Sequence, residues 1–192
     1  MGRPPRYDAD FLLDCAVQLV VDRGPAAVTV AGVASAAGAP SGSVYHRFSG
    51  RTVLLAALWL RTVHRFQVGF FATLTGPEAI DAALAAALHT VTWSRENPTE
   101  AQLLLHGPNE FGYADWRAED REQAARDQHH VAAAMAKLTR RLGLRGAAGR
   151  DRVTFAVIDV PLALVGRHVR RSGRVPGGSE DLVATTVRAL LS

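Results

Sequence analysis

The sequence predicts an all-α protein of about nine helices, and three observations support this fold class. Apolar residues recur every three or four positions through most of the chain, which is the spacing of one helix face. No segment shows the strict alternation of apolar and polar residues that is typical of a half-buried strand. Separators rich in glycine and proline divide the periodic segments. We therefore expect a three-helix N-terminal domain, residues 1–51, which a long helix joins to a helical domain of residues 52–192.

The first helix is expected from about Ala9 to Arg23. Asp8 or Asp10 lies near its start, and Gly24 with Pro25 ends it. Its apolar residues form doublets that recur every four positions and should pack on the next two helices: Phe11, Leu12, Cys15, Ala16, Leu19 and Val20. Because the single cysteine falls within this stripe, a small buried thiol explains it better than a redox sensor does.

The segment from residue 29 to residue 51 has the pattern of a helix-turn-helix followed by the start of another helix. Thr29 can cap a short helix whose apolar face contains Val30, Val33, Ala34 and Ala37. Gly38 can adopt the positive φ that a sharp turn needs, and Pro40 favours a new helical start. Val44 and Phe48, four residues apart, are expected to face the first helix. This spacing leaves a small, polar outer face that suits a major groove: Ser41, Gly42, Ser43, Tyr45, His46 and Arg47.

Six further helical segments are expected after residue 51, over about 52–73, 77–95, 98–106, 115–142, 149–172 and 179–191. Pro161 lies inside one of them. Proline removes a backbone hydrogen bond and clashes with the preceding turn, at a cost of about 3 kcal/mol in a helix interior. We therefore expect a kink or a break between Val157 and Pro161, with or without a ligand beside it.

Composition limits the classes of protein that the chain can belong to. With 192 residues and 48% hydrophobic residues, it can bury a stable core without disulfide bonds or structural metal ions. One cysteine excludes an intramolecular disulfide, which favours a reducing compartment. No apolar stretch reaches the roughly 18 to 20 residues that span a bilayer, and the N-terminus lacks the apolar core of a signal peptide. A cytoplasmic protein without a membrane partner is expected.

The charge of the chain favours an anionic partner only mildly. It has 22 Lys and Arg residues against 18 Asp and Glu residues, a net charge of +4. Through Thr52 there are five basic and four acidic residues, so affinity for DNA would depend on a few well-placed groups and on two copies of the domain. Arg3 and Arg6 in the N-terminal arm could enter a minor groove or could belong to a solvated tail.

The sequence AGAPSGSVYHRFSGRTVLL, residues 37–55, resembles the recognition helix and the following helix of the TetR family of transcriptional regulators. The glycine, the Val44-Tyr45 pair, Phe48 and the Leu54-Leu55 pair stand in the order typical of that family. Three features depart from its pattern: Pro40 replaces a polar cap, Gly50-Arg51 replaces Ser-Lys, and Ala31-Gly32 bring no polar group to the second helix.

This resemblance implies a homodimeric, ligand-responsive transcription factor, most often a repressor, that binds a near-palindromic operator and is released by a small-molecule effector. The N-terminal helix-turn-helix would be the DNA-binding domain, and the fourth helix would transmit changes from a helical ligand-binding and dimerisation domain. The residues expected to contact DNA are Thr29, Ser41, Gly42, Ser43, Tyr45, His46, Arg47 and Arg51.

Aromatic and polar side chains of the C-terminal domain could line an effector pocket, since ligand cavities are mostly apolar with a few polar groups. The candidates are Phe66, Phe70, Trp93, His106, Phe111, Trp116, Phe155 and Asp159. Each of them could equally be an ordinary core residue. The resemblance favours a pocket without identifying its lining.

The last two long helices carry apolar stripes that could form a dimer surface of two helices from each subunit. The candidates are Val157, Leu164, Leu182, Val183, Val187 and Leu190. A helix pair buried within one subunit is the alternative.

The sequence contains no nucleophile elbow, phosphate-binding loop, dinucleotide fingerprint or metal-ligand spacing. His129 and His130 are adjacent in a charged helix and cannot both face one site. We therefore expect neither catalysis nor a cofactor. The alternative function is a helical small-molecule-binding or catalytic protein whose helix-turn-helix no longer binds DNA.

Overall fold

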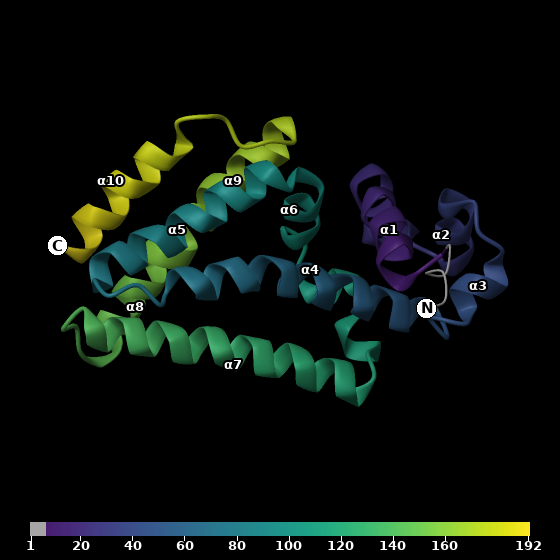
Figure 1. Cartoon of the computed structure of the whole chain (residues 1–192), viewed down its shortest axis with the longest axis horizontal. Coiled ribbons are helices and arrows are strands. Elements are labelled where there is room, and N and C mark those ends of the chain that lie inside the picture. The colour runs from purple at the N-terminus through teal and green to yellow at the C-terminus, as the bar shows by residue number, and fades with distance from the viewer. Residues whose placement is uncertain (1–6) are drawn as a thin grey trace, which may run out of the picture. The chain divides into compact units, whose positions relative to one another are not determined.

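A computed structural model describes residues 7–192, and all regular elements in this range are helical (Figure 1). The α-helices are α1 (Ala9–Arg23), α2 (Val30–Ala37), α3 (Ser41–Tyr45), α4 (Arg51–Thr73), α5 (Ala79–Glu96), α6 (Pro98–Leu104), α7 (Ala118–Arg141), α8 (Gly146–Thr154), α9 (Val160–Ser172) and α10 (Ser179–Leu191). A π-helical turn, Phe155–Asp159, joins α8 directly to α9. Counting this run as one helix leaves nine helices among the described residues, apart from three short 3-10 helices, and the predicted all-α class is confirmed.

Three short 3-10 helices were not predicted: η1 (Pro25–Ala27), η2 (Pro108–Phe111) and η3 (Tyr113–Asp115). The first follows Gly24, and the other two lie in the connection that we expected to be a loop. Each spans three or four residues, as is usual for this type of helix.

The described residues form two compact units. The first comprises the chain up to Val63 together with Leu103–Ala124, and the second comprises His64–Gln102 and Ala125–Ser192. Leu54, Leu55 and Leu58, in the first half of α4, are fully buried in the core of the first unit. The division by packing therefore differs from the functional division predicted between residues 51 and 52.

The bounds of α1 match the prediction because both of its ends are set locally. The carboxylate of Asp8 accepts a hydrogen bond from the backbone N–H of Phe11 at 2.8 Å, and Gly24 ends the helix with a φ of 77°. The buried face is rotated from the predicted stripe and contains Leu12, Leu13, Ala16, Val17 and Val20. Phe11 is 43% exposed, so its predicted place in the core is wrong. Apolar residues that recur every four positions are compatible with either of two faces of α1. The packing of α2 on α1 determines which face is buried.

Cys15 lies at the edge of the buried face of α1, where it packs against the core and is half-buried. Burial, with a smaller contribution from the negative charge of Asp14, raises the pKa of its thiol. A protonated thiol is a poor nucleophile, which agrees with the structural role that the sequence predicted.

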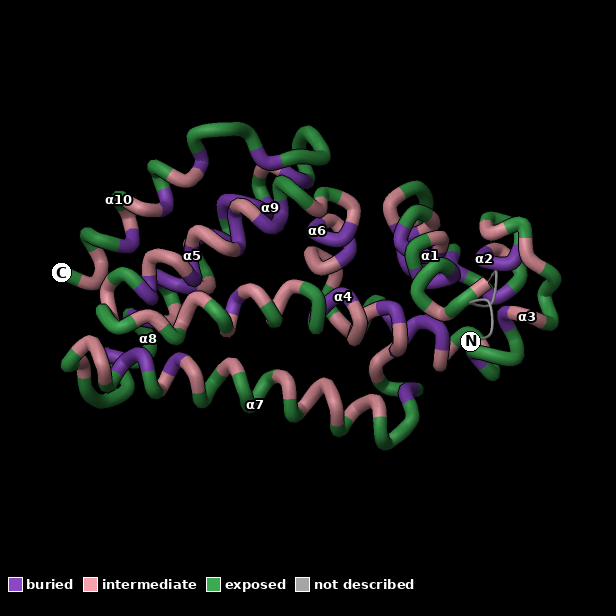
Figure 2. Tube along the Cα trace, in the orientation of Figure 1, coloured by how far each residue is buried: buried purple, intermediate pink, exposed green. Residues whose placement is uncertain are grey.

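The second unit packs α5 against α9, α10 and the π-helical turn. The small residues Ala82, Ala83 and Ala86 of α5 lie in the same buried cluster as Val153 and Val157. Figure 2 shows buried and exposed positions alternating along α10, as expected of a helix that buries one face. The guanidinium of Arg95 on α5 forms an ion pair with Glu180 on α10.

Where a kink or a break was predicted near Pro161, the structure has a π-helical turn without a break in the helical run. The π-helical turn ends at Asp159, and α9 begins at Val160 with the proline in its first turn. Proline interrupts the regular α-helical hydrogen bonding, and here it directly follows the π-helical turn within the continuous helical run.

No helix within residues 7–192 has an apolar stretch long enough to cross a lipid bilayer.

Candidate functional site

The helix-turn-helix has the local geometry that the sequence predicted. The hydroxyl of Thr29 accepts a hydrogen bond from the N–H of Gly32 at 3.0 Å and caps α2. Gly38 ends α2 in the left-handed region, at a φ of 59°, and Pro40 precedes α3. Val44 is fully buried and Phe48 is 5% exposed, so both side chains attach α3 to the core of the first unit.

The opposite side of α3 is a polar surface. Its exposed residues are Ser41, Gly42, Tyr45, His46 and Arg47, and Ser43 is half-buried. The aromatic side chain of Tyr45 is 55% exposed. These are the residues that the sequence predicted to face outward, and the structure brings them together on one short helix and its C-terminal end.

The N-terminal side of α1 is tied to this motif by two hydrogen bonds. The hydroxyl of Tyr7 donates to the carbonyl of Gly38 at 3.0 Å, and Nε of Arg47 donates to the carbonyl of Tyr7 at 2.8 Å. These contacts hold the turn before α3 and Arg47, which lies two residues after the end of α3. The arm residues Arg3 and Arg6 lie outside the described residues.

The side chain of Arg51 forms hydrogen bonds within the protein that its sequence pattern did not predict. Its Nε donates to the carbonyl of Val28 at 2.8 Å, and its Nη2 donates to the carbonyls of Pro25 at 3.2 Å and Ala26 at 3.1 Å. The side chain therefore connects the start of α4 to η1. The positive charge of Arg51 therefore lies beside three backbone carbonyls of the first unit.

The eight residues predicted to line an effector pocket do not form one site. His106, Phe111 and Trp116 belong to the first unit. Phe111 is fully buried and Trp116 is 1% exposed, and the indole N–H of Trp116 donates to the carbonyl of Phe111 at 2.9 Å. Nδ1 of His106 lies 2.7 Å from a carboxylate oxygen of Glu110. These contacts are those of core and loop residues.

Three of the predicted aromatics meet in the second unit. The ring of Phe66 stacks on that of Phe70 at 5.7 Å between centroids and meets the indole of Trp93 edge-on at 5.3 Å. Phe155 is 52% exposed, and Asp159 is also exposed. The aromatic spacing therefore identified the cluster on α4 and α5 but not the position of the other five residues.

A small hollow of about 180 Å³ lies beside this aromatic cluster. We name it the α4–α5 hollow. Its lining residues come from α4, α5, α7, the π-helical turn and α9: Phe66, Gln67, Phe70, Thr90, Val131, Ile158 and Leu162. Only Phe66 and Phe70 of this lining were predicted.

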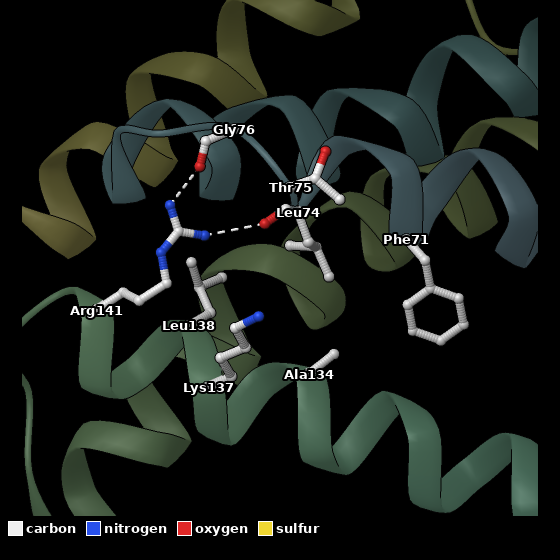
Figure 3. Close-up of a pocket in the computed structure, with 8 residues that line it drawn as sticks. All are labelled: Phe71, Leu74, Thr75, Gly76, Ala134, Lys137, Leu138 and Arg141. Atoms are coloured by element: carbon white, nitrogen blue, oxygen red, sulfur yellow. Dashed lines mark hydrogen bonds between the residues drawn. The ribbon is translucent and has the colours of Figure 1, made fainter.

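A second hollow, of about 400 Å³, lies between the end of α4 and the end of α7 (Figure 3). Nη1 of Arg141 donates to the carbonyl of Leu74 at 2.9 Å, and Nη2 donates to the carbonyls of Gly76 and Pro77. The positive charge thus stabilises the carbonyls that follow α4, where the helix dipole is negative. This use of Arg141 is structural.

The predicted dimer residues divide into buried and exposed groups. Val157, Val183 and Val187 are fully buried within the single chain, and Leu164 is 7% exposed. They belong to the chain's own core because α5 and the neighbouring helices cover them. Leu182 is 55% exposed and Leu190 is half-buried. Phe155 and Leu162 are also exposed, although neither was predicted to belong to the dimer surface.

No group of three His, Cys, Asp or Glu side chains within residues 7–192 is arranged to hold a metal ion.

Comparison with known proteins agrees with this geometry. Residues 12–58 match the family model described as "Bacterial regulatory proteins, tetR family". This segment contains most of α1, all of α2 and α3, and the first turns of α4. No curated protein sequence matches the chain.

Solved structures share the whole fold. The fatty acid degradation regulator FadR from Bacillus halodurans is 15% identical, with a TM-score of 0.74 over 100% of this chain and 97% of that one. A TetR family transcription regulator from Marinobacter aquaeolei VT8 is 17% identical, with a TM-score of 0.74 over 95% and 93%. FadR from Bacillus subtilis, solved in complex with stearoyl-CoA, is 12% identical, with a TM-score of 0.73 over 96% and 98%. Residues 12–58, which include the helix-turn-helix, are thus similar to the N-terminal segment of bacterial regulatory proteins of the tetR family.

Proposed function

We propose that this protein is a homodimeric transcriptional repressor that binds a near-palindromic operator and leaves it when a small molecule binds. The observation that carries the proposal is the exposed polar face of α3, on a helix-turn-helix that matches the family. As a DNA-binding regulator it would act in the cytoplasm.

The proposed DNA contacts divide by role. Ser41, Ser43, Tyr45 and His46 contact base edges or phosphates, and Gly42 permits a close approach because it has no side chain. Arg47 contacts the DNA backbone while its Nε remains bonded to Tyr7. Thr29 and Arg51 contribute mainly by holding α2 and α4 in position, since both are engaged with backbone groups of the first unit.

A dimer is part of the proposal because a single helix-turn-helix domain offers few cationic groups for binding DNA. Two-fold symmetry would present two copies of α3 to two half-sites one helical turn apart or more. Phe155, Leu162 and Leu182 are exposed apolar residues of the π-helical turn, α9 and α10, and a partner's helices would remove them from water. Of the dimer surface that the sequence predicted, the exposed Leu182 and the half-buried Leu190 remain within this proposal.

Effector release rests on the hollow in the second unit and on α4, whose residues belong to both compact units. Bacillus subtilis FadR has the same fold and was solved with stearoyl-CoA, which supports the choice of a small molecule as the signal. An effector acts only if it binds the DNA-competent and DNA-incompetent dimers with different affinities. The chain needs no catalytic group for this function.

Footprinting on the DNA upstream of the protein's own gene tests the proposal. We expect a protected site with two-fold symmetry. Replacing Tyr45 and His46 together by alanine should weaken binding to that site by about tenfold to a hundredfold, because base contacts carry this order of discrimination. His129→Ala is the matched control, since His129 is exposed on α7 far along the chain from α3.

Equal operator binding by the wild type and the Tyr45→Ala, His46→Ala double variant would refute the assigned DNA face. The absence of any sequence-dependent, salt-sensitive binding would favour a small-molecule-binding or catalytic protein that no longer binds DNA.

A further inference from the structure

Thr90 on α5 differs in its hydrogen bonding from the two other buried threonines in the described range, Thr62 on α4 and Thr139 on α7. The hydroxyl of Thr62 donates to the carbonyl of Leu58 at 2.9 Å, and that of Thr139 donates to the carbonyl of Met135 at 2.7 Å. Thr90 is 3% exposed and lines the α4–α5 hollow. Its hydroxyl forms no hydrogen bond to any residue in the range 7–192. Because Thr90 borders the hollow, its hydroxyl can bond to a ligand that brings a polar atom to it.

The rest of the lining restricts the chemistry of that ligand. Five of the seven lining residues are apolar, and Gln67 is the other polar one. None of the seven is ionisable, so a charged group would lose its hydration here without gaining a counter-ion. An uncharged ligand is favoured.

The size of the hollow sets a second restriction. A volume of about 180 Å³ is smaller than the roughly 300–1,000 Å³ typical of sites for drug-sized molecules. A wider groove of about 470 Å³ shares two lining residues with the hollow, Val131 and Ile158. These two residues therefore border both the hollow and the groove, so a smaller side chain at either position would enlarge the space open to a ligand. Ile158 belongs to the π-helical turn, a type of element that is frequent at functional sites.

We propose that the α4–α5 hollow is the effector site and that its effector is a small, uncharged, mostly apolar molecule with one hydroxyl or carbonyl group bonded to Thr90. The inference rests on the proposed effector response. It predicts a ligand class unlike a fatty acyl-CoA, whose phosphates would find no cation in this lining.

Calorimetric titration of the full chain in the absence of DNA tests the site, with benzyl alcohol and toluene as probes. The two molecules have similar size and differ by the hydroxyl. We expect the wild type to bind benzyl alcohol about fivefold to tenfold more tightly than toluene, as one neutral hydrogen bond provides. Thr90→Val should remove this preference, and Thr90→Ser should keep it.

Thr92→Val is the matched control on the same helix, because the hydroxyl of Thr92 already bonds to the carbonyls of Leu88 and His89. It should leave the preference unchanged. Ile158→Ala should extend the range of binding alcohols toward longer ones. Failure of the wild type to bind benzyl alcohol, or an equal preference in wild type and Thr90→Val, would overturn the proposed site.

Operator release separates this inference from the proposed function. Binding that depends on Thr90 but leaves the operator complex intact would support the site and refute the effector response. Release by octanoyl-CoA that is unaffected by Thr90→Val would support an effector response and overturn the ligand class inferred here.

Discussion

Gly69 on α4 and His89 on α5 lie so close that a Cβ at residue 69 would overlap the imidazole ring. The Nε2 atom of His89 lies 3.0 Å from the carbonyl oxygen of Phe66. The centroid of the His89 imidazole is 5.2 Å from that of the Phe66 phenyl ring. The absence of a side chain at Gly69 therefore permits the contact that joins α4 to α5 beside the aromatic cluster.

Gly69→Ala should destabilise the protein by about 1–3 kcal/mol, since overpacking forces the ring or the helices to move. Thermal unfolding measures the effect, and His89→Ala in the same chain should recover part of the loss. Gly42→Ala is the control, because no atom lies within 4 Å of a Cβ there. An equal loss of stability in both glycine variants would contradict the role given to the close contact.

Arg51→Ala should lower the stability of the first unit by about 1–3 kcal/mol, because three backbone carbonyls lose a charged donor. It should leave the slope of operator affinity against salt concentration nearly unchanged, since the guanidinium is engaged within the protein. Urea unfolding and a salt titration of operator binding measure the two effects. A slope reduced by about one with unchanged stability would instead identify Arg51 as a phosphate contact.

The ion pair between Arg95 and Glu180 should make the stability of the protein depend on pH. The hydrogen bond from Arg95 holds the pKa of the Glu180 carboxyl below its ordinary value, although partial burial opposes this. A pKa lowered by folding stabilises the protein at pH values above the unfolded pKa, about 4.3, and the effect is lost as pH falls through the folded pKa. The difference in Tm between wild type and Glu180→Gln should therefore be positive at neutral pH and vanish in acid.

Asp181→Asn provides the comparison for that pair. Asp181 is exposed and is the next residue on α10, and it forms no ion pair with any residue in the described range. A difference of similar size and pH dependence in both variants would show that the effect comes from net charge rather than from the contact with Arg95.

Leu182→Glu should weaken dimerisation by at least about tenfold, because it places a charge on an apolar surface that the proposed dimer removes from water. Sedimentation equilibrium over a series of protein concentrations measures the change. Val68→Glu is matched in exposure, at 59% against 55%, and should leave the dimer intact. A dimer lost in the Val68 variant alone would move the interface to α4.

The helices and the helix-turn-helix were predictable because their signals are local. Asp8, Thr29, Gly38 and Pro161 each act within one turn of their own position, so residue type and spacing were sufficient. The bounds of α1 and α10 agree with the prediction for this reason.

The surfaces were less predictable because they depend on which helix covers which. Periodicity marked Val157, Val183 and Val187 as apolar, but only the packed chain shows that α5 and its neighbours already cover them. In the same way, residue type alone could not predict that Trp93 and Trp116 belong to different compact units. The partners of Arg51 and the isolated hydroxyl of Thr90 left no signal in the sequence.

The π-helical turn also affects the rotational phase of the helix that contains it. Val153, Val157, Pro161, Val165 and Val169 are all buried at a strict spacing of four residues. In a regular α-helix each step of four turns the side chain about 40° further around the axis, so the stripe would leave the core within a few turns. A wider turn takes up part of that rotation and keeps the stripe facing inward on both sides of the proline. Loss of one residue from this segment would therefore turn the apolar face of α9 toward water without changing a single amino acid within it.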